Sequence, residues 1–430
     1  MADLTTQHLP LLRSYRLPGL DLGNGYVYPN YTGRSILNLP DSICAWLGAP
    51  GIGNRPLELD LHNLLEGQVQ RVIVLLVDAL SLHRLQRWMA DDIAPVWTDL
   101  AQAGALAPLT SITPSTTSSA LTSLWTGRSP AEHGIPGYEI WLREYGVVAS
   151  MIFHSPISFH NDVGSLERAG FKPEVFMNMS TLGTQLSAHG IKTYALQHRS
   201  IINSGLSQMF FKDVDVRGFH TLADLFINLR HVVEDRPRER QYIWVYTGDL
   251  DTLSHYYGPD DERSEASFSS FSYAFEQFFL KRLSPAGRRG TALVLTADHG
   301  QVTTPYNQHY ELNNHPELAR RLHILPTGEN RMIYLYRRPG QTEAVREYFE
   351  RVFPNQFSFI DPSYAVDQGL FGMGSPHPRL LERLGDLIVA ARGNAYLWWA
   401  DKKNYLVGRH GGLTEEEMVV PFLVTRLDLF

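Results

Sequence analysis

Three apolar segments of this chain each run into an aspartate. Segment 72–77 is followed by Asp78, segment 242–247 leads within four residues to Asp251, and segment 293–297 is followed by Asp298. Such segments predict buried parallel strands, whose carboxyl ends meet at the edge of a sheet where open α/β folds place their sites. Three carboxylates in one crevice repel one another unless cations lie among them. The sequence therefore predicts a metal centre at that edge.

Histidines accompany these aspartates. His255 lies four residues after Asp251, a spacing that puts both side chains on one face of a helix, and His299 directly follows Asp298. His410 is followed by two glycines, which permit a tight turn with a protruding imidazole. Each residue alone is also typical of a helix cap, a surface histidine or a loop, and only their joint placement favours a metal site. Mixed nitrogen and oxygen ligands without a thiolate suit Zn²⁺ best, with Mn²⁺ or Fe as alternatives, and six ligands suffice for two divalent ions.

Bulk properties narrow the class of protein. The chain has 430 residues, of which 43% are hydrophobic and 19% charged, as expected for one large α/β domain with insertions or for two domains. The formal net charge of -7, without a basic block, argues against a nucleic-acid-binding surface. Cys44 is the only cysteine and is expected to be a buried structural thiol. Neither a signal peptide nor an apolar run of about 18 residues is recognised, so we expect no membrane partner and a cytoplasmic location.

Strands that alternate with helices predict a doubly wound, mostly parallel central sheet with helices on both faces. We expect three regions: residues 1–70 as an N-terminal extension wrapping the core, with one helix near 35–47; residues 71–300 and 386–430 as the core; and residues 301–385 as a small α+β cap insertion. Phenylalanines at helical spacing in 262–283 predict core packing. The cap aromatics Tyr306, Tyr310 and Phe371 either stack on a substrate base or pack, and packing is favoured.

A hydroxyl-rich segment, 110–126, leads into a predicted helix. Pro114 ends the preceding strand, and the hydroxyls of residues 115–119 lie where the helix begins. A helix N-terminus offers free N–H groups and a positive dipole end, which favour a bound phosphate or sulfate. The alternative is a well-capped helix whose first turn has no chemical role.

Taken in order, these motifs resemble those of the alkaline phosphatase superfamily, and within it the type I phosphodiesterase/nucleotide pyrophosphatase branch. The resemblance spans residues 72 to 412, and the joint order of the motifs is specific although each alone is weak. The motifs are Asp78, Pro114-Ser-Thr-Thr117, Thr126-Gly-Arg-Ser-Pro-Ala-Glu-His-Gly-Ile135, Asp251-Thr-Leu-Ser-His-Tyr-Tyr-Gly-Pro259, Ala297-Asp-His-Gly300 and His410-Gly-Gly412.

The resemblance implies an alkaline phosphatase-like fold and a two-metal phosphodiesterase or nucleotide pyrophosphatase that forms a covalent phospho-threonine intermediate. It identifies Thr117 as the nucleophile, with Thr116 as the competing hydroxyl. Its substrate would be a small phosphorylated molecule, a nucleotide being one candidate. The alternatives are a phosphomonoesterase or phosphonate hydrolase of the same superfamily, and a non-catalytic relative that binds a phosphorylated ligand. The implied ligands are Asp251, His255 and His410 for one ion, and Asp78, Asp298, His299 and the Thr117 oxygen for the other.

Two departures from the family leave nucleotide specificity open. The nucleotide pyrophosphatases carry a phosphate-binding Asn shortly after His-Gly-Ile, where this chain has Tyr138, and an Asn three residues after the nucleophile, where it has Ala120. The phosphate contact is therefore expected from the Tyr138 side chain, from a backbone N–H, or not at all. Monoesterases place a cation in the space that diesterases leave for a second substituent on phosphorus. Arg128 is a candidate for that cation. The segment lacks a Cys/Ser-x-Pro-x-Arg motif, which argues against a sulfatase.

Overall fold

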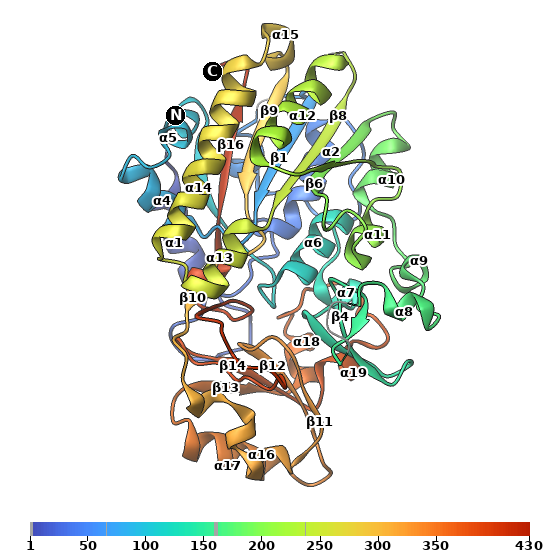
Figure 1. Ribbon diagram of the computed structural model, residues 1–430, viewed down its shortest axis with the longest axis vertical. Coiled ribbons are helices and arrows are strands. Elements are labelled where there is room, and N and C mark those ends of the chain that lie inside the picture. The colour runs from blue at the N-terminus through green and yellow to red at the C-terminus, as the bar shows by residue number, and fades with distance from the viewer. Residues whose placement is uncertain (1–2, 66, 159–161, 237) are drawn as a thin grey trace.

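Two seven-stranded sheets organise the protein (Figure 1). The structure, a computed structural model, describes residues 3–65, 67–158, 162–236 and 238–430. The first sheet has the strand order β2-β16-β9-β1-β8-β6-β7. Its strands are β1 (Arg71–Val77), β2 (Ala105–Thr110), β6 (Lys192–His198), β7 (Asp215–Phe219), β8 (Gln241–Thr247), β9 (Thr291–Thr296) and β16 (Val419–Arg426).

Parallel pairing dominates the first sheet. β1 pairs in parallel with β8 and β9, and β6 pairs in parallel with β7 and β8, whereas β16 runs antiparallel to β9 and β2. Every residue of β1 and β9 is buried, because helices cover both faces of the sheet, and this explains the unbroken apolar runs in the sequence. In Figure 1, α12 and α14 cross in front of the strands and α2 lies behind them. The predicted doubly wound, mostly parallel sheet is confirmed.

The helices around this sheet follow the predicted pattern closely. The predicted helix near 35–47 is confirmed by α2, in which Cys44 is fully buried, and burial raises the pKa of its thiol to about 12. The larger helices are α1 (Thr5–Ser14), α2 (Leu39–Trp46), α4 (Leu82–Ala90), α5 (Pro95–Ala103), α6 (Thr117–Thr126), α10 (Leu182–Ser187), α11 (Gly205–Phe210), α12 (Leu222–Asp235), α13 (Asp249–Tyr257) and α14 (Glu262–Ala274). The shorter ones in this half are α3 (Leu59–His62), α7 (Pro130–His133), α8 (Ser165–Arg168), α9 (Pro173–Phe176), α15 (Pro285–Arg288) and α20 (Glu415–Met418).

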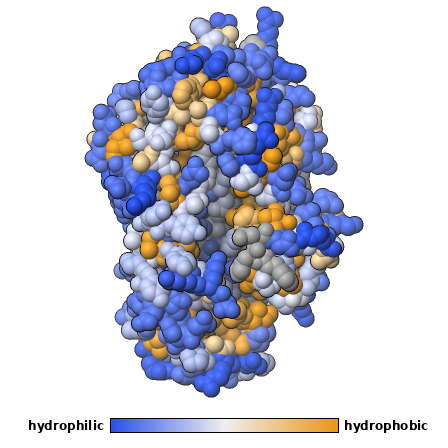
Figure 2. Space-filling model, viewed as in Figure 1, coloured by the Kyte–Doolittle hydropathy of each residue, from blue (hydrophilic) through white to orange (hydrophobic). Residues whose placement is uncertain are grey.

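The aromatic stripe after residue 262 packs in the core, as predicted. Phe268, Phe271 and Phe275 are buried, and Trp97 of α5 stacks on Phe275 with ring centroids 4.9 Å apart. The outer surface is different, since the face in Figure 2 is mostly hydrophilic, with hydrophobic side chains in small scattered groups. Within the described residues, no helix combines the length and apolar character that crossing a membrane requires.

The second sheet is antiparallel and has the order β13-β14-β12-β11-β3-β4-β5. Its strands are β3 (Glu139–Leu142), β4 (Val147–Ser150), β5 (Ser155–Pro156), β11 (Leu322–Gly328), β12 (Met332–Arg337), β13 (Phe357–Ile360) and β14 (Leu387–Ala391). It is accompanied by α16 (Pro316–Ala319), α17 (Thr342–Val352), α18 (Pro362–Asp367) and α19 (Leu380–Leu384), and a small ribbon pairs β10 (Val302–Thr303) with β15 (Gly408–Arg409).

The second sheet corrects two expected boundaries. Strand β14 was expected to return to the core at residue 386, but it pairs with β12 and β13. Strands β3 to β5, which lie within the expected core region 71–300, belong to the second sheet through the contact of β3 with β11. All five residues of β14 are buried, so its sequence has the same apolar run as a strand of the parallel sheet. The second sheet thus extends beyond residues 301–385 on both sides.

The described N-terminal residues touch both halves. Asp3 and Ser35 form isolated bridges with β2 of the first sheet, at Leu106 and Thr110. The Tyr26 hydroxyl donates to the carbonyl of Ala390 in the second sheet, at 3.1 Å. The segment therefore packs along the junction between the two sheets.

A buried ion pair also joins the halves. Arg331, in the loop between β11 and β12, binds Glu417 of α20 with Nε–Oε1 and Nη2–Oε2 distances of 2.6 and 2.9 Å, and both side chains are fully buried. Glu417 in turn accepts the N–H of Gly412, two residues after His410, at 2.8 Å. We expect Arg331→Met to lower the free energy of unfolding by about 3–5 kcal/mol, because it leaves a carboxylate buried without its cation.

Urea unfolding monitored by circular dichroism measures this loss. The matched control is Arg87→Met, which removes the exposed partner of Asp260 and is expected to cost less than about 1 kcal/mol. An Arg331→Met protein as stable as the Arg87→Met protein would contradict the assigned role of the buried pair.

Candidate active site

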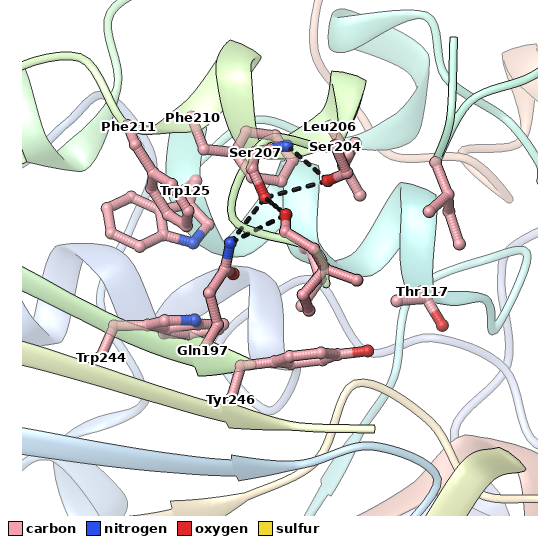
Figure 3. Close-up of a pocket in the computed structure, with 13 residues that line it drawn as sticks. Thr117, Trp125, Gln197, Ser204, Leu206, Ser207, Phe210, Phe211, Trp244 and Tyr246 are labelled. Carbon is pink, nitrogen blue, oxygen red and sulfur yellow. Dashed lines mark hydrogen bonds between the residues drawn. The ribbon is translucent and has the colours of Figure 1, made fainter. Parts of the chain in front are cut away.

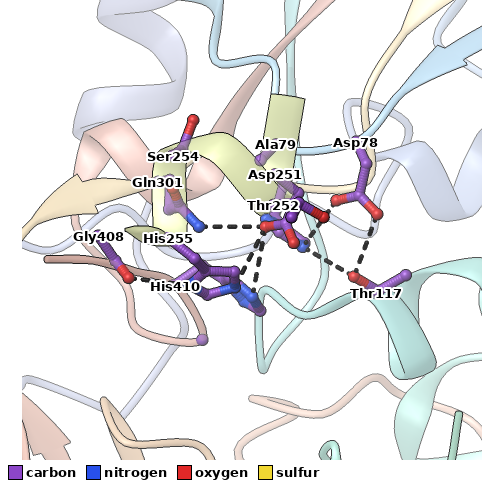
Figure 4. Close-up of polar contacts among 12 residues, drawn as sticks. Asp78, Ala79, Thr117, Asp251, Thr252, Ser254, His255, Gln301, Gly408 and His410 are labelled. Atoms are coloured by element: carbon purple, nitrogen blue, oxygen red, sulfur yellow. Dashed lines mark hydrogen bonds and ion pairs between the residues drawn. The ribbon is translucent and has the colours of Figure 1, made fainter. Parts of the chain in front are cut away.

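The predicted carboxylates meet at the carboxyl edge of the first sheet. Asp78 follows β1, Asp298 lies just beyond β9, and Asp251 lies in the first turn of α13, which begins after the neighbouring β8. The ligand atoms of Asp78, Asp298 and His299 lie within 4.8 Å of one another, and so do those of Asp251, His299 and His410. Figure 4 shows Asp78 and Thr117 on one side of this cluster, with His410 and Gln301 on the other.

The three histidines are oriented alike. The Nδ1 atoms of His255, His299 and His410 lie 2.9, 2.9 and 3.1 Å from the backbone carbonyls of Gly408, Gly300 and Ser115. A carbonyl only accepts, so each Nδ1 carries the proton and each Nε2 keeps a lone pair. Metal-ligating histidines in proteins are typically fixed in this way.

These Nε2 atoms face the carboxylates. His299 Nε2 lies 3.4 Å from Asp78 Oδ1 and 3.5 Å from Asp298 Oδ2. Asp251 Oδ1 lies 3.4 Å from His255 Nε2 and 3.8 Å from His410 Nε2. His255 contacts Asp251 but lies outside the two compact groups, whereas His299 belongs to both. The cluster thus forms two adjoining groups of side chains that could hold metal ions.

Two buried carboxylate oxygens support a cation here. Asp78 Oδ1 and Asp298 Oδ2 have no hydrogen-bond partner among the residues that the structure describes, and both side chains are at most 2% exposed. Burial, together with the charges of Asp298 and Asp251, raises the pKa of Asp78 well above its ordinary value, and burial also raises the pKa of Asp298. Burial, followed by the nearby His299 and His255, lowers the pKa of His410 well below its ordinary value. Carboxyl groups with unpaired oxygens beside imidazole nitrogens are a donor set that fits divalent metal ions.

The hydroxyls of the adjacent residues Thr116 and Thr117 have different neighbours. Thr117 is the first residue of α6, and its Oγ1 lies 3.4 Å from Asp78 Oδ2 and 3.2 Å from His299 Nε2. The hydroxyl of Thr116 instead acts on the carboxyl group of Glu329, whose pKa it lowers. Of these two threonine hydroxyls, it is that of Thr117 that contacts the carboxylate and imidazole cluster.

The two predicted substrate-binding side chains do not join this cluster. Burial raises the pKa of the Tyr138 phenol to about 12, and the nearby Ser150 opposes that rise. Arg128 lies just beyond the C-terminal end of α6, where its Nη1 contacts Glu132 Oε1 at 3.2 Å. Because α6 has ten residues, its two ends are about 15 Å apart.

Sequence reasoning missed three polar side chains around the cluster. The Tyr246 hydroxyl donates to Asp78 Oδ2, and Gln301 Nε2 donates to Asp251 Oδ1 at 3.1 Å. Tyr246 and Gln301 lie close in sequence to predicted ligand motifs, so sequence reasoning could have found them. Glu329 comes from the second sheet and carries no such signal.

A cavity of about 60 Å³ opens beside Thr117, between α6, α11 and β8 (Figure 3). Its walls are mainly aromatic and aliphatic, including Trp125, Phe210 and Trp244. Gln197 Nε2 donates to Ser207 Oγ at 2.8 Å, and Figure 3 shows the Gln197 side chain beside Tyr246. None of the described residues that line the cavity is charged. The cavity can therefore accept an uncharged organic group next to the Thr117 hydroxyl.

Tyr246 offers a test of the cluster as a metal site. We expect Tyr246→Phe to weaken metal binding roughly tenfold, because hydrogen bonds to ligating carboxylates fix their orientation. Isothermal titration with Zn²⁺ measures the affinity. Tyr242→Phe is the matched control, since Tyr242 lies on the same strand, is buried, and packs on Trp125 with ring centroids 5.9 Å apart. Equal affinities for the two variants would argue against Asp78 as a ligand.

Comparisons with known proteins agree with this geometry. The sequence model of the family described as type I phosphodiesterase / nucleotide pyrophosphatase matches residues 72–413. Among solved structures, murine ectonucleotide pyrophosphatase/phosphodiesterase 5 has a TM-score of 0.61 and 15% identity, covering 82% of this chain and 87% of its own; an inactive variant of it in complex with AMP gives the same values. No curated protein matches the chain significantly.

A second kind of neighbour comes from bacteria. Phosphonoacetate hydrolase from Sinorhizobium meliloti, in complex with phosphonoformate, has a TM-score of 0.60 and 17% identity, covering 82% of this chain and 89% of its own. At these identities the structural neighbours establish the fold, while the family model covers most of the chain. The chain therefore belongs to the type I phosphodiesterase/nucleotide pyrophosphatase family of metal-dependent phosphoric ester hydrolases.

Proposed function

We propose that this protein is a two-metal phosphodiesterase of the nucleotide pyrophosphatase type, with Thr117 as its nucleophile. The observation that carries the proposal is the position of Thr117 Oγ1, 3.4 Å from Asp78 and 3.2 Å from His299 Nε2, at the start of a helix. His299 belongs to both ligand sets, so the hydroxyl lies where the two sets adjoin. The hydroxyl of the alternative nucleophile, Thr116, acts instead on the carboxyl group of Glu329.

The residues that would hold the ions fall into two groups. When bound, two divalent cations would lower the pKa of the Thr117 hydroxyl and neutralise charge on the phosphoryl and leaving oxygens. The nitrogen and oxygen donor set favours Zn²⁺, with Mn²⁺ or Fe as alternatives. We assign Asp78, Asp298, His299 and the Thr117 oxygen to one ion, and Asp251, His255 and His410 to the other.

The chain's own groups position the reaction. Thr117 Oγ1 loses its proton and attacks phosphorus, the bond from phosphorus to the leaving oxygen breaks, and the departing alcohol takes up a proton. Water then attacks the phosphorus of the phospho-threonine, the bond from phosphorus to Oγ1 breaks, and a proton from the water restores the Thr117 hydroxyl. Tyr246 orients Asp78, and Gln301 orients Asp251, through the hydrogen bonds described above. The free N–H groups at the start of α6 face the same region and favour phosphoryl oxygens.

The surroundings of Thr117 favour a diester over a monoester. Arg128, the candidate cation, is engaged by Glu132 at the other end of α6. The uncharged cavity beside Thr117 offers space for a second substituent on phosphorus. Phosphonate hydrolysis is the second candidate, because a structural neighbour is a phosphonoacetate hydrolase. Phosphonoacetate carries a carboxylate, however, and among the described residues that line the cavity there is no charged side chain to bind it.

One assay separates these candidates. The protein loaded with Zn²⁺ or Mn²⁺ is expected to hydrolyse bis(p-nitrophenyl) phosphate faster than p-nitrophenyl phosphate, and both faster than phosphonoacetate. Faster turnover of the monoester or of phosphonoacetate would select the corresponding alternative. Loaded protein that binds phosphate but turns over none of the three would be a non-catalytic ligand-binding relative.

A further inference from the structure

The hairpin between β11 and β12 carries a buried glutamate to the nucleophile segment. Glu329 closes this hairpin through backbone hydrogen bonds with Met332 and is 9% exposed. Its Cβ and Cγ lie 2.4 and 2.6 Å from where a Cβ would stand on Gly411, whose φ is +103°. A larger residue than glycine at position 411 would clash with Glu329. The Glu329 side chain therefore packs directly against the turn after His410.

The Glu329 carboxyl group engages two donors beside the nucleophile. Tyr138 N–H donates to Glu329 Oε1 at 2.8 Å, and the nearby Thr116 hydroxyl lowers the pKa of the same carboxyl group. Thr116 is the N-cap residue of α6, but its side chain makes no capping bond to the helix. Donors grouped beside a helix N-terminus commonly bind the oxygens of an anion. In this chain an internal carboxyl group occupies them.

The charge around Glu329 is acidic. Burial, with smaller contributions from the nearby Glu139 and Asp251, raises its pKa to about 8, although Thr116 and the Tyr138 N–H oppose the shift. Above that pH the side chain adds a negative charge beside the nucleophile segment. A phosphomonoester brings two negative charges and three non-bridging oxygens, whereas a diester brings one charge and two such oxygens. The two substrates therefore differ in the number of oxygens that need a donor and in the negative charge that the Glu329 carboxylate would repel.

We propose that Glu329 is a specificity-determining residue that discriminates against phosphomonoesters: it occupies two donors that a third phosphoryl oxygen would use and repels a second negative charge. The inference rests on the proposed function and narrows its substrate class to monoanionic phosphodiesters. A like charge several ångströms away, in a partly screened site, changes the relative rates for a dianion and a monoanion by roughly tenfold.

The test compares kcat/KM for p-nitrophenyl phosphate and bis(p-nitrophenyl) phosphate at pH 9 in Zn²⁺-loaded wild type and Glu329→Gln. We expect the monoester-to-diester ratio to rise roughly tenfold in Glu329→Gln. Glu139→Gln is the matched control, because Glu139 is a buried carboxyl group of the same sheet whose partner is Trp399 Nε1, at 2.9 Å. Its ratio is expected to stay at the wild-type value. An unchanged ratio in folded, metal-loaded Glu329→Gln overturns the proposal.

A measurement on wild type covers the case in which Glu329→Gln fails to fold. Inorganic phosphate and dimethyl phosphate are compared as competitive inhibitors of diester hydrolysis at pH 9. Weaker inhibition by the phosphate dianion than by the dimethyl phosphate monoanion supports the proposal, and stronger inhibition overturns it. Failure of the proposed function has a different signature, since loaded wild type would then hydrolyse neither p-nitrophenyl substrate.

Discussion

Thr117→Ala is expected to lower kcat for bis(p-nitrophenyl) phosphate by at least about 10³-fold while the protein keeps its metal ions, because the substitution removes the attacking oxygen. Six charged or imidazole side chains remain in place around the lost hydroxyl. The backbone at the start of α6 is unaffected, since alanine is a good helix former. Steady-state kinetics and metal analysis by mass spectrometry of the same preparation measure the two quantities together.

Two neighbouring hydroxyls provide the controls for this prediction. Ser118→Ala removes a hydroxyl that donates to the carbonyl of Gly137 at 2.9 Å, and its kcat is expected to stay within about tenfold of wild type. Thr116→Val removes the hydroxyl that lowers the pKa of Glu329, and it is expected to keep most of the diesterase activity. Full turnover by Thr117→Ala, or loss of turnover in Thr116→Val alone, would transfer the nucleophile role away from Thr117.

The first sheet and the ligand cluster could be predicted because the same residues determine both. A strand buried on both faces must be apolar along its length, so an aspartate at its end is conspicuous in the sequence. The strands that lead to Asp78, Asp251 and Asp298 are neighbours in the sheet, and this adjacency brings their ends together. Short spacings in the sequence, such as that between Asp251 and His255, then predict that the histidines lie beside the aspartates.

The second sheet could not be assigned from the sequence because its strands come from distant segments. The apolar residues of β14 do not reveal whether they pair with β12 or with a core strand, since both environments are buried. Glu329 illustrates the consequence for the site. Its contact with Tyr138 joins residues 191 positions apart, and no periodicity records such a pairing. The orientation of Arg128 toward Glu132 was equally out of reach, because a motif position does not fix where a long side chain points.

Removing the divalent ions is expected to abolish turnover and to lower the melting temperature, with a deficit that grows as the pH rises. In the metal-free protein, burial and the neighbouring carboxylates raise the pKa of Asp78 well above its ordinary value, and burial raises that of Asp298. A carboxyl group with a raised folded-state pKa contributes its full stability below about pH 4, near its unfolded pKa, and loses it as the pH rises through the folded-state pKa. Bound cations remove this penalty because they stabilise the charged form.

Calorimetry of chelator-treated and Zn²⁺-loaded protein between pH 6 and 9 tests the expectation. The melting temperature of the metal-free protein should fall across this range, and the gap to the loaded protein should widen. Asp298→Asn tests whether repulsion between the carboxylates is the cause, because it removes one of them without changing the size of the side chain. Metal-free Asp298→Asn should therefore melt above metal-free wild type at pH 8 while binding fewer ions. If the metal-free melting temperature is independent of pH, or if chelated protein keeps its activity, the carboxylates at the ends of β1 and β9 are not held together by metal.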